Sequence, residues 1–236
     1  MIRFYSPDIL TDRRLPESDS KHCVRVLRMR AGDAIEIVDG KGHCYRCILA
    51  DENPKAASIE IIETLDLPPV WNYNITVAVA PTKHMDRMEW LVEKLTEIGV
   101  NRIVPLLCQR SERKEIKTER LEKIAVSAMK QSLKAVLPEI TSMMPIHELI
   151  RDFSSAQKFI GYCDSAIERR LLAKECLPEK DVLIAIGPEG DFSPQEIEQA
   201  FRAGFVPVTM GDNRLRTETA ALVACDTVHI VNQINA

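Results

Sequence analysis

Residues 182–193 read VLIAIGPEGDFS, an unbroken apolar run followed by a glycine-containing turn. Such a short apolar run is typical of a strand that is buried on both faces of a parallel sheet. After the turn, Ser193 is the expected N-cap of a helix, with Pro194 at the first helical position and Glu196 completing a capping box. The stretch therefore predicts a strand, a tight loop and a helix, which is the repeating unit of an α/β fold.

A second stretch has the same organisation. Residues 206–220 read VPVTMGDNRLRTETA, again an apolar run, a polar loop and the start of a helix-like segment. Loops at the carboxyl ends of parallel strands are where open α/β sheets bind ligands, and glycines let the backbone approach a ligand closely. The two loops suit a nucleotide-like cofactor, although neither carries a phosphate-loop or dinucleotide fingerprint. A well-capped turn without a ligand is the alternative.

Strands and helices alternate through the rest of the C-terminal region. This pattern predicts a mostly parallel sheet with both faces covered by helices. Gly99 is the expected end of one helix and Pro138 of the next. The expected strands cover residues 75–80, 103–107, 158–163, 182–186 and 206–210, and the expected helices cover residues 85–99, 120–137, 194–203 and 217–234.

The N-terminal region has a different pattern. Apolar alternation over residues 34–38, 43–50 and 58–65, with a turn signal at 39–42, predicts short β-strands. A Leu-Pro-Pro sequence at 67–69 ends this region. We therefore expect two domains, a small β-barrel over residues 1–69 and an α/β domain over residues 70–236.

Composition narrows the class of protein. The chain has 236 residues, 45% of them hydrophobic, seven cysteines and a net charge of −4. No apolar N-terminal leader or membrane-length apolar run is present, so we expect a cytoplasmic protein with reduced thiols and no membrane partner. Residues 1–30 carry seven Lys and Arg against four acids, and residues 102–134 carry nine against four, so local basic patches can still contact RNA.

No metal site is expected. Cys44 and Cys47 have zinc-knuckle spacing, but a second Cys pair does not follow. In a strand these two side chains point to opposite faces, so a hairpin strand with two small apolar side chains is the favoured interpretation. The histidines show no ligand spacing, and no Gly-x-Ser-x-Gly elbow of a serine hydrolase occurs.

Together, the two loops resemble those of the SPOUT superfamily of S-adenosylmethionine-dependent RNA methyltransferases. The likeness is close to the bacterial family that methylates N3 of a uridine in 16S ribosomal RNA. That family carries Gly-Pro-Glu-Gly-Gly-Phe-Ser and then Leu-Arg-Thr-Glu-Thr-Ala, matched here at 187–193 and 215–220, with Asp191 in place of a glycine. Residues 94–100 and 110–111 also match, whereas Lys134 stands where the family usually has arginine.

The resemblance implies more about the fold and its partners than the residue pattern does. It implies a SPOUT-type sheet with a deep trefoil knot, and a PUA-like RNA-binding barrel in which residues 22–28 look most like the family. It also implies a homodimer through the C-terminal domain and a role in ribosomal RNA processing during ribosome biogenesis. The implied partner is 16S ribosomal RNA, with the assembled small subunit as the expected substrate.

The resemblance also assigns the cofactor site. S-adenosylmethionine is expected to contact the backbone of the two loops, and its adenine is expected to lie between apolar side chains. Asp191 would place a negative charge near the cationic sulfonium, which would help binding, or it would cap the helix. The expected cofactor-binding residues are Ile186, Gly187, Pro188, Glu189, Gly190, Met210, Gly211, Leu215, Thr219 and Ala220.

Methylation of uracil at N3 requires that the base first become an anion. The N3 atom carries a proton at neutral pH, and its loss spreads negative charge onto O2 and O4. A guanidinium beside a carbonyl oxygen would stabilise that anion, which makes Arg110 and Arg216 candidates. Glu218 or Glu189 would accept the proton, although both also suit a helix N-terminus. The expected RNA-binding residues are Arg13, Arg14, Arg25, Arg28, Lys83, Arg87 and Lys94.

Three alternatives stay open from the sequence. A related enzyme would methylate a ribose 2′-OH, which the N-terminal barrel and the Leu-Arg-Thr-Glu-Thr-Ala run disfavour. A non-catalytic RNA-binding protein would keep the fold, with Asp191 and Lys134 as signs of lost activity. A flavodoxin-like or Rossmann nucleotide binder would be expected to carry a phosphate fingerprint. The favoured hypothesis is an S-adenosylmethionine-dependent enzyme that methylates uridine N3.

Overall fold

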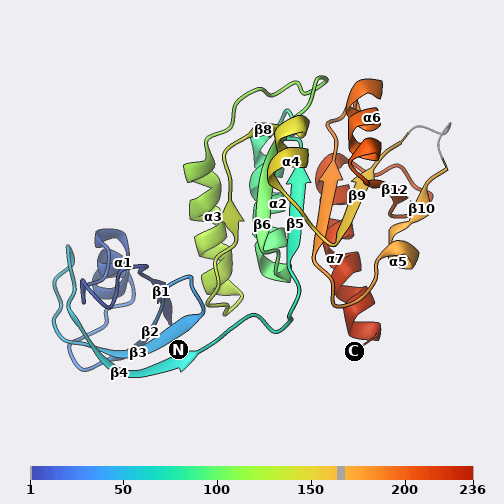
Figure 1. The fold of residues 1–236 in the computed structure, drawn as a ribbon. Coiled ribbons are helices and arrows are strands. Elements are labelled where there is room, and N and C mark those ends of the chain that lie inside the picture. Colours follow the sequence, from blue (N-terminus) through green and yellow to red (C-terminus); the bar gives the residue numbers. More distant parts are fainter. Residues whose placement is uncertain (1, 164–167, 236) are drawn as a thin grey trace. The chain divides into compact units, whose positions relative to one another are not determined.

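The computed structural model describes residues 2–163 and 168–235, which form two compact units. Residues 2–70 and 126–137 make up the first unit. Residues 71–125 and the described residues from 138 onward make up the second (Figure 1). The predicted division after residue 69 stays a prediction, and the structure adds residues 126–137 to the N-terminal unit.

The first unit is built on a four-stranded sheet in the order β1-β2-β3-β4. β1 is parallel to β2, and the other neighbours are antiparallel. Ile35 and Ile37 alternate with more exposed residues along β2 and pack against Phe4 and Tyr45. The strands are β1 (Arg3–Tyr5), β2 (Ala34–Val38), β3 (His43–Leu49) and β4 (Ile59–Asp66), and helix α1 (Glu17–Lys21) continues into a π-helix (His22–Val26).

Cys44 and Cys47 both lie on β3 and belong to different hydrophobic clusters. Cys47 packs in the cluster around Ile35, whereas Cys44 packs with Met129 and Ala135. Burial raises the pKa of Cys47 to about 12, so its thiol is neutral at physiological pH. The prediction of a hairpin strand with two small apolar side chains on opposite faces is confirmed.

The predicted helix over 120–137 is wrong at its C-terminal end. Helix α3 (Thr118–Gln131) ends six residues early, where Leu133 adopts a left-handed φ of 58° and Lys134 N donates to Met129 O at 3.0 Å. The chain then pairs with the turn between β2 and β3, because Gly42 N donates to Ala135 O and Leu137 N donates to Gly40 O. These tertiary hydrogen bonds replace those of a longer helix, so Pro138 does not end it.

The second unit contains an eight-stranded sheet whose pairs are all parallel. The order is β10-β12-β9-β11-β5-β6-β7, and β8 also pairs with β6. Every residue of β11 is buried, as its apolar run predicts. The strands are β5 (Ile75–Val79), β6 (Arg102–Leu107), β7 (Glu139–Ile140), β8 (Met144–Pro145), β9 (Gln157–Gly161), β10 (Arg170–Leu171), β11 (Val182–Ile186) and β12 (Val206–Thr209).

Helices cover both faces of this sheet. Helices α2 and α7 pack together, and α7 lies against β5 and β11, while α4 and α6 pack on the core formed by Ala78, Val104 and Leu183 (Figure 1). The predicted α/β fold with a covered parallel sheet is thus confirmed, and the trefoil knot stays a prediction. The helices are α2 (Met85–Ile98), α4 (Ile146–Asp152), α5 (Leu172–Glu175), α6 (Pro194–Arg202) and α7 (Thr217–Ile234). Within the described residues, no helix combines the length and apolar character that crossing a bilayer requires.

The predicted start of α6 and the predicted end of α2 are confirmed. Ser193 is the N-cap of α6, and the capping box is complete, because Glu196 Oε2 accepts from Ser193 N at 2.7 Å and Ser193 Oγ accepts from Glu196 N. Gly99 caps α2 with φ 108°, and a Cβ at this position would lie 2.1 Å from the Trp71 ring. Only glycine meets both the left-handed backbone and this close approach.

Candidate active site

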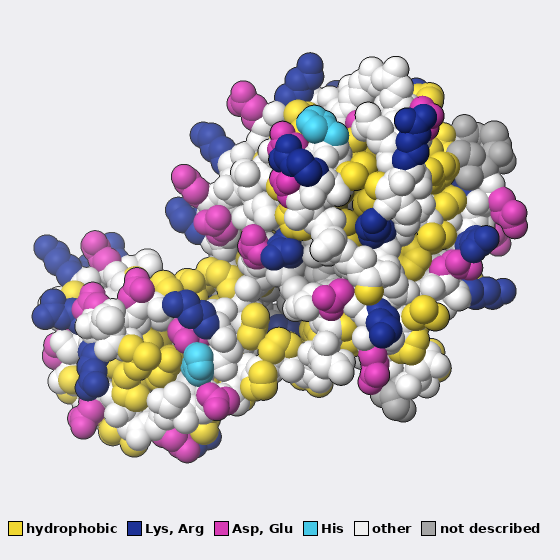
Figure 2. All heavy atoms as spheres, viewed as in Figure 1, with side chains coloured by type: hydrophobic (Ala, Val, Ile, Leu, Met, Phe, Trp, Pro, Cys, Tyr) yellow, Lys and Arg dark blue, Asp and Glu magenta, His cyan; other side chains and the backbone are white. Residues whose placement is uncertain are grey.

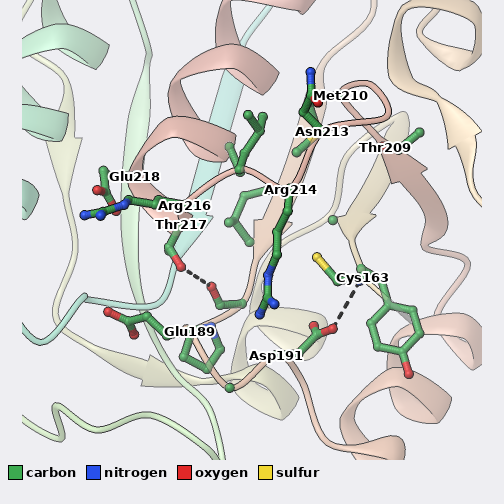
Figure 3. A pocket seen from close by; sticks show the side chains of 18 of the residues that line it. Cys163, Glu189, Asp191, Thr209, Met210, Asn213, Arg214, Arg216, Thr217 and Glu218 are labelled. Carbon is green, nitrogen blue, oxygen red and sulfur yellow. Dashed lines mark hydrogen bonds between the residues drawn. The ribbon is translucent and has the colours of Figure 1, made fainter. Parts of the chain in front are cut away.

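A pocket of about 1050 Å³ opens at the carboxyl ends of β9, β11 and β12. Both predicted loops line it, together with the start of α7 and the segment before α2 (Figure 3). The carboxyl edge of a parallel sheet is the expected place for a ligand in this fold class. The sequence thus predicted the two loops that form most of the pocket wall.

Nine of the ten expected cofactor-binding residues line the pocket; Thr219 does not. A hydrogen bond joins the two loops, because Thr217 Oγ1 at the start of α7 donates to Gly187 O at 3.1 Å (Figure 3). A Cβ on Gly187 would lie 3.0 Å from the Phe192 ring, so the loop packs closely there. The lining residues from the expected set are Ile186, Gly187, Pro188, Glu189, Gly190, Met210, Gly211, Leu215 and Ala220.

Apolar side chains gather at one part of the wall. A Cβ built on Gly161 at the end of β9 would lie 2.8 Å from Ile186 Cδ1 and 3.7 Å from Met210 Cε. Glycine at 161 therefore lets the Ile186 side chain lie directly against the backbone at the end of β9. Sequence reasoning placed Ile186 and Met210 but missed residues 161–163. The signal was present, because the strand that ends at Gly161 has its carboxyl end at the same sheet edge.

Two of the three candidate catalytic residues line the pocket. Arg216 is exposed, and among residues 2–163 and 168–235 its guanidinium makes no hydrogen bond or ion pair. Glu218 is only 7% exposed, and its Oε1 lies 3.7 Å from Nη1 of Arg87. The site therefore combines a free guanidinium with a largely buried carboxylate on neighbouring positions of the second loop and α7.

Arg110, the third candidate, lies behind the first loop and is not among the residues that line the pocket. Its Nη1 donates to Gly190 O at 3.0 Å and to Phe192 O at 3.3 Å. The guanidinium thus holds the loop backbone. Burial raises the pKa of the adjacent Cys108 thiol, so this thiol stays neutral. The geometry favours a positioning role for Arg110, and its catalytic role stays a prediction.

The expected RNA-binding residues fall into three groups. Lys83 and Arg87 line the pocket, and Lys83 forms an ion pair with Glu112. Lys94 lies elsewhere on α2, where it pairs with Glu93 and Glu97 on its own helix. The arginines of the first unit all have exposed side chains: Arg13, Arg14, Arg25 and Arg28. Arg28 follows the π-helix and has a left-handed φ of 56°, which is uncommon for a residue other than glycine.

Asp191 stands in the first loop with φ 61°, a conformation that aspartate tolerates better than most residues. Its Oδ1 accepts from Phe192 N at 2.8 Å, and its Oδ2 accepts from Cys163 N at 3.1 Å (Figure 3). Of the two roles considered for this residue, capping α6 belongs instead to Ser193. The carboxylate joins the first loop to the end of β9 and lines the pocket.

Charges of both signs line the pocket. Among the described lining residues, five are cationic and five carry carboxylates: Lys83, Arg87, Arg169, Arg214 and Arg216, with Glu112, Glu189, Asp191, Asp212 and Glu218. Figure 2 likewise shows Lys and Arg side chains interspersed with Asp and Glu on the visible face of each unit. Any recognition of RNA by this chain therefore depends on particular side chains rather than on a uniformly basic surface.

Two families of known protein domains match this chain. Residues 69–229 match the RNA methyltransferase domain family, and residues 15–62 match the RNA methyltransferase PUA domain. Fold and pocket thus define an RNA methyltransferase domain with a PUA domain before it.

Similar proteins show to which family of RNA methyltransferases the chain belongs. The chain is 32% identical over 214 residues to ribosomal RNA small subunit methyltransferase E of Aquifex aeolicus (strain VF5), an alignment that spans 88% of this chain and 90% of the relative. It also resembles the crystal structure of a probable rRNA-methyltransferase from Porphyromonas gingivalis, with 45% identity, a TM-score of 0.95 and 100% of each chain covered. The chain belongs to the ribosomal RNA small subunit methyltransferase E family.

A further structure shows a ligand in this family. Ribosomal RNA small subunit methyltransferase E from Neisseria gonorrhoeae, solved bound to S-adenosyl methionine, is 30% identical to this chain, with a TM-score of 0.83 and 98% of each chain covered. The family resemblance seen in the two loops is therefore confirmed.

Proposed function

We propose that this chain transfers a methyl group from S-adenosylmethionine to N3 of a uridine in 16S ribosomal RNA, with the assembled small subunit as substrate. The observation that carries the proposal is the pocket in which both signature loops meet, with the free Arg216 and the buried Glu218 on its wall. The membership of the chain in its family supports the same reaction.

The pocket fits the cofactor. Ile186, Met210 and Leu215 offer apolar surface for an adenine on the wall of the pocket. The loop backbones supply hydrogen-bonding groups around this surface. When bound, S-adenosylmethionine supplies a methyl group on a cationic sulfonium, so the remaining chemistry belongs to the residues of this chain.

Those residues act on the uracil. Glu218 accepts the N3 proton, and Arg216 stabilises the resulting anion at a carbonyl oxygen of the base. The walls hold N3 in line with the methyl carbon, so the new N–C bond forms as the S–C bond breaks. A neutral thioether leaves, and the positive charge of the sulfonium is lost together with the negative charge of the uracil anion.

The reaction is tested by incubating the protein with labelled S-adenosylmethionine and small subunits from cells that lack it. Label in the RNA supports an enzyme. Binding of the subunits without transfer would instead favour the non-catalytic RNA-binding alternative. Label on ribose would favour the 2′-O-methyltransferase.

RNA contacts by the first unit have a measurable signature. Replacing both Arg25 and Arg28 with glutamine should weaken RNA binding and lower the slope of log Kd against log salt by roughly 1.4 to 1.8, because each phosphate contact contributes about 0.7–0.9. Both side chains are exposed, so the fold should survive. The exposed Arg46, which pairs with Glu63, provides a matched control as Arg46→Gln. An unchanged salt slope in the double variant would remove these arginines from the interface.

We also propose a homodimer through the C-terminal domain. Helix α7 exposes Ile230 at 45% and Ile234 at 76%, and residues at this spacing share one face of a helix, which a partner subunit would cover. Sedimentation velocity at micromolar concentration should give a dimer, and Ile230→Asp together with Ile234→Asp should give a monomer. A wild-type protein that sediments as a monomer would contradict this arrangement.

A further inference from the structure

Arg214 is a pocket residue that the proposed reaction does not use. Its side chain extends from the second loop into the pocket, toward the side that carries Asp191 (Figure 3). Within the described part of the chain, this guanidinium makes no hydrogen bond or ion pair. Because arginine is always charged and has five donors, an unpaired one in a pocket is suited to a carboxylate or phosphate of a ligand.

Asp191 supplies a fixed opposite charge on that side of the pocket. The hydrogen bonds from Phe192 N and Cys163 N hold both carboxylate oxygens in place. Each oxygen keeps further acceptor capacity, so the group can still bind a cation. Asp191 and Arg214 do not form an ion pair with each other, which leaves both charges available to a ligand.

We propose that Arg214 and Asp191 bind the amino-acid end of the cofactor, Arg214 its α-carboxylate and Asp191 its α-ammonium. The inference rests on the proposed function and deepens it. A zwitterion has both charges on neighbouring atoms, so it matches a free guanidinium and an anchored carboxylate. An RNA phosphate would fit Arg214 but would be repelled by Asp191, so the observations favour the zwitterion.

The two arginines of the second loop then have different roles. Arg216 lies on the side of the pocket that holds Glu218, whereas Arg214 reaches toward Asp191 and Cys163 (Figure 3). Arg214 therefore binds the cofactor and Arg216 the base.

The test compares two ligands by isothermal titration. S-adenosylhomocysteine has the amino-acid end, and 5′-methylthioadenosine lacks it while keeping the adenosyl thioether. Arg214→Gln should weaken S-adenosylhomocysteine about tenfold to a hundredfold, as expected for a charge-assisted hydrogen bond, and leave 5′-methylthioadenosine unchanged. Asp191→Asn, which also tolerates the left-handed backbone, should show the same pattern.

Matched controls lie on α6. Arg202 and Glu198 are exposed and pair with each other, so Arg202→Gln and Glu198→Gln should bind both ligands as the wild type does. Equal weakening of both ligands by Arg214→Gln and Asp191→Asn would show that these residues only shape the pocket and would overturn the inference. Unchanged binding of both ligands would do the same, as would weaker RNA binding by Arg214→Gln with S-adenosylhomocysteine unaffected. A wild type that binds neither ligand would instead remove the proposed function itself.

Discussion

Replacing Arg216 with alanine is expected to lower kcat for methyl transfer about 10²- to 10³-fold, which is the usual loss when a donor to a developing anion is removed. Without the guanidinium, the uracil oxygen loses the donor that we propose for its developing charge. The side chain is exposed and makes no hydrogen bond within residues 2–163 and 168–235, so the free energy of unfolding should change by less than about 0.5 kcal/mol. Single-turnover methylation and urea unfolding together measure both effects.

Two companion variants sharpen this result. Arg216→Lys keeps the charge but loses the planar pair of donors, so it should recover part of the rate. Arg202→Ala, which removes an exposed arginine far along α6 from its N-cap, should leave the rate intact. A rate for Arg216→Ala equal to that of the wild type would take this residue out of the mechanism.

Replacing Glu218 with glutamine is expected to lower kcat about 10²- to 10⁴-fold, the range for a general base. Glutamine keeps the shape of the side chain but cannot take the N3 proton. Because hydroxide then has to remove that proton, the rate of the variant should rise steadily with pH, whereas the wild-type rate should level off. A pH–rate profile from pH 6 to 10 measures this difference, which a merely structural role of Glu218 would not produce.

Glu189→Gln is the matched control for this variant. Glu189 also lines the pocket, but it is exposed, and its Oε1 accepts from Lys83 N at 3.3 Å. It should therefore lose much less rate than Glu218→Gln and keep the wild-type pH profile. If the two variants exchanged these behaviours, Glu189 would be the base and the assignment of Glu218 would be wrong.

The sequence predicted most elements of the second unit because their signals are local. The apolar run of β11, the capping box at Ser193 and the glycine at 99 each act within a few residues of the chain. The end of α3 was predicted wrongly, because the bonds that decide it come from Gly40 and Gly42, about ninety residues earlier. Hydrogen bonds between distant segments do not alter the helical spacing of apolar residues, so that spacing could not predict them.

In the candidate site, too, some features could be predicted from the sequence and others could not. Backbone positions of the two loops could be placed from their glycines and neighbouring strands, and nearly all of them line the pocket. The direction of a side chain was harder to foresee. Arg110 follows a strand end, as a catalytic residue often does, yet its guanidinium is taken up by two carbonyls of the first loop. Arg214, only two residues before Arg216, extends into the pocket (Figure 3).

The methylated atom can be identified by mass spectrometry of nucleosides from small subunits that lack this modification, after incubation with the protein and S-adenosylmethionine. We expect one new 3-methyluridine per subunit with the wild-type protein and almost none with Arg216→Ala. A methyl group on a ribose 2′-oxygen, or 3-methyluridine formed equally by both proteins, would contradict the assignment of this pocket to uracil N3.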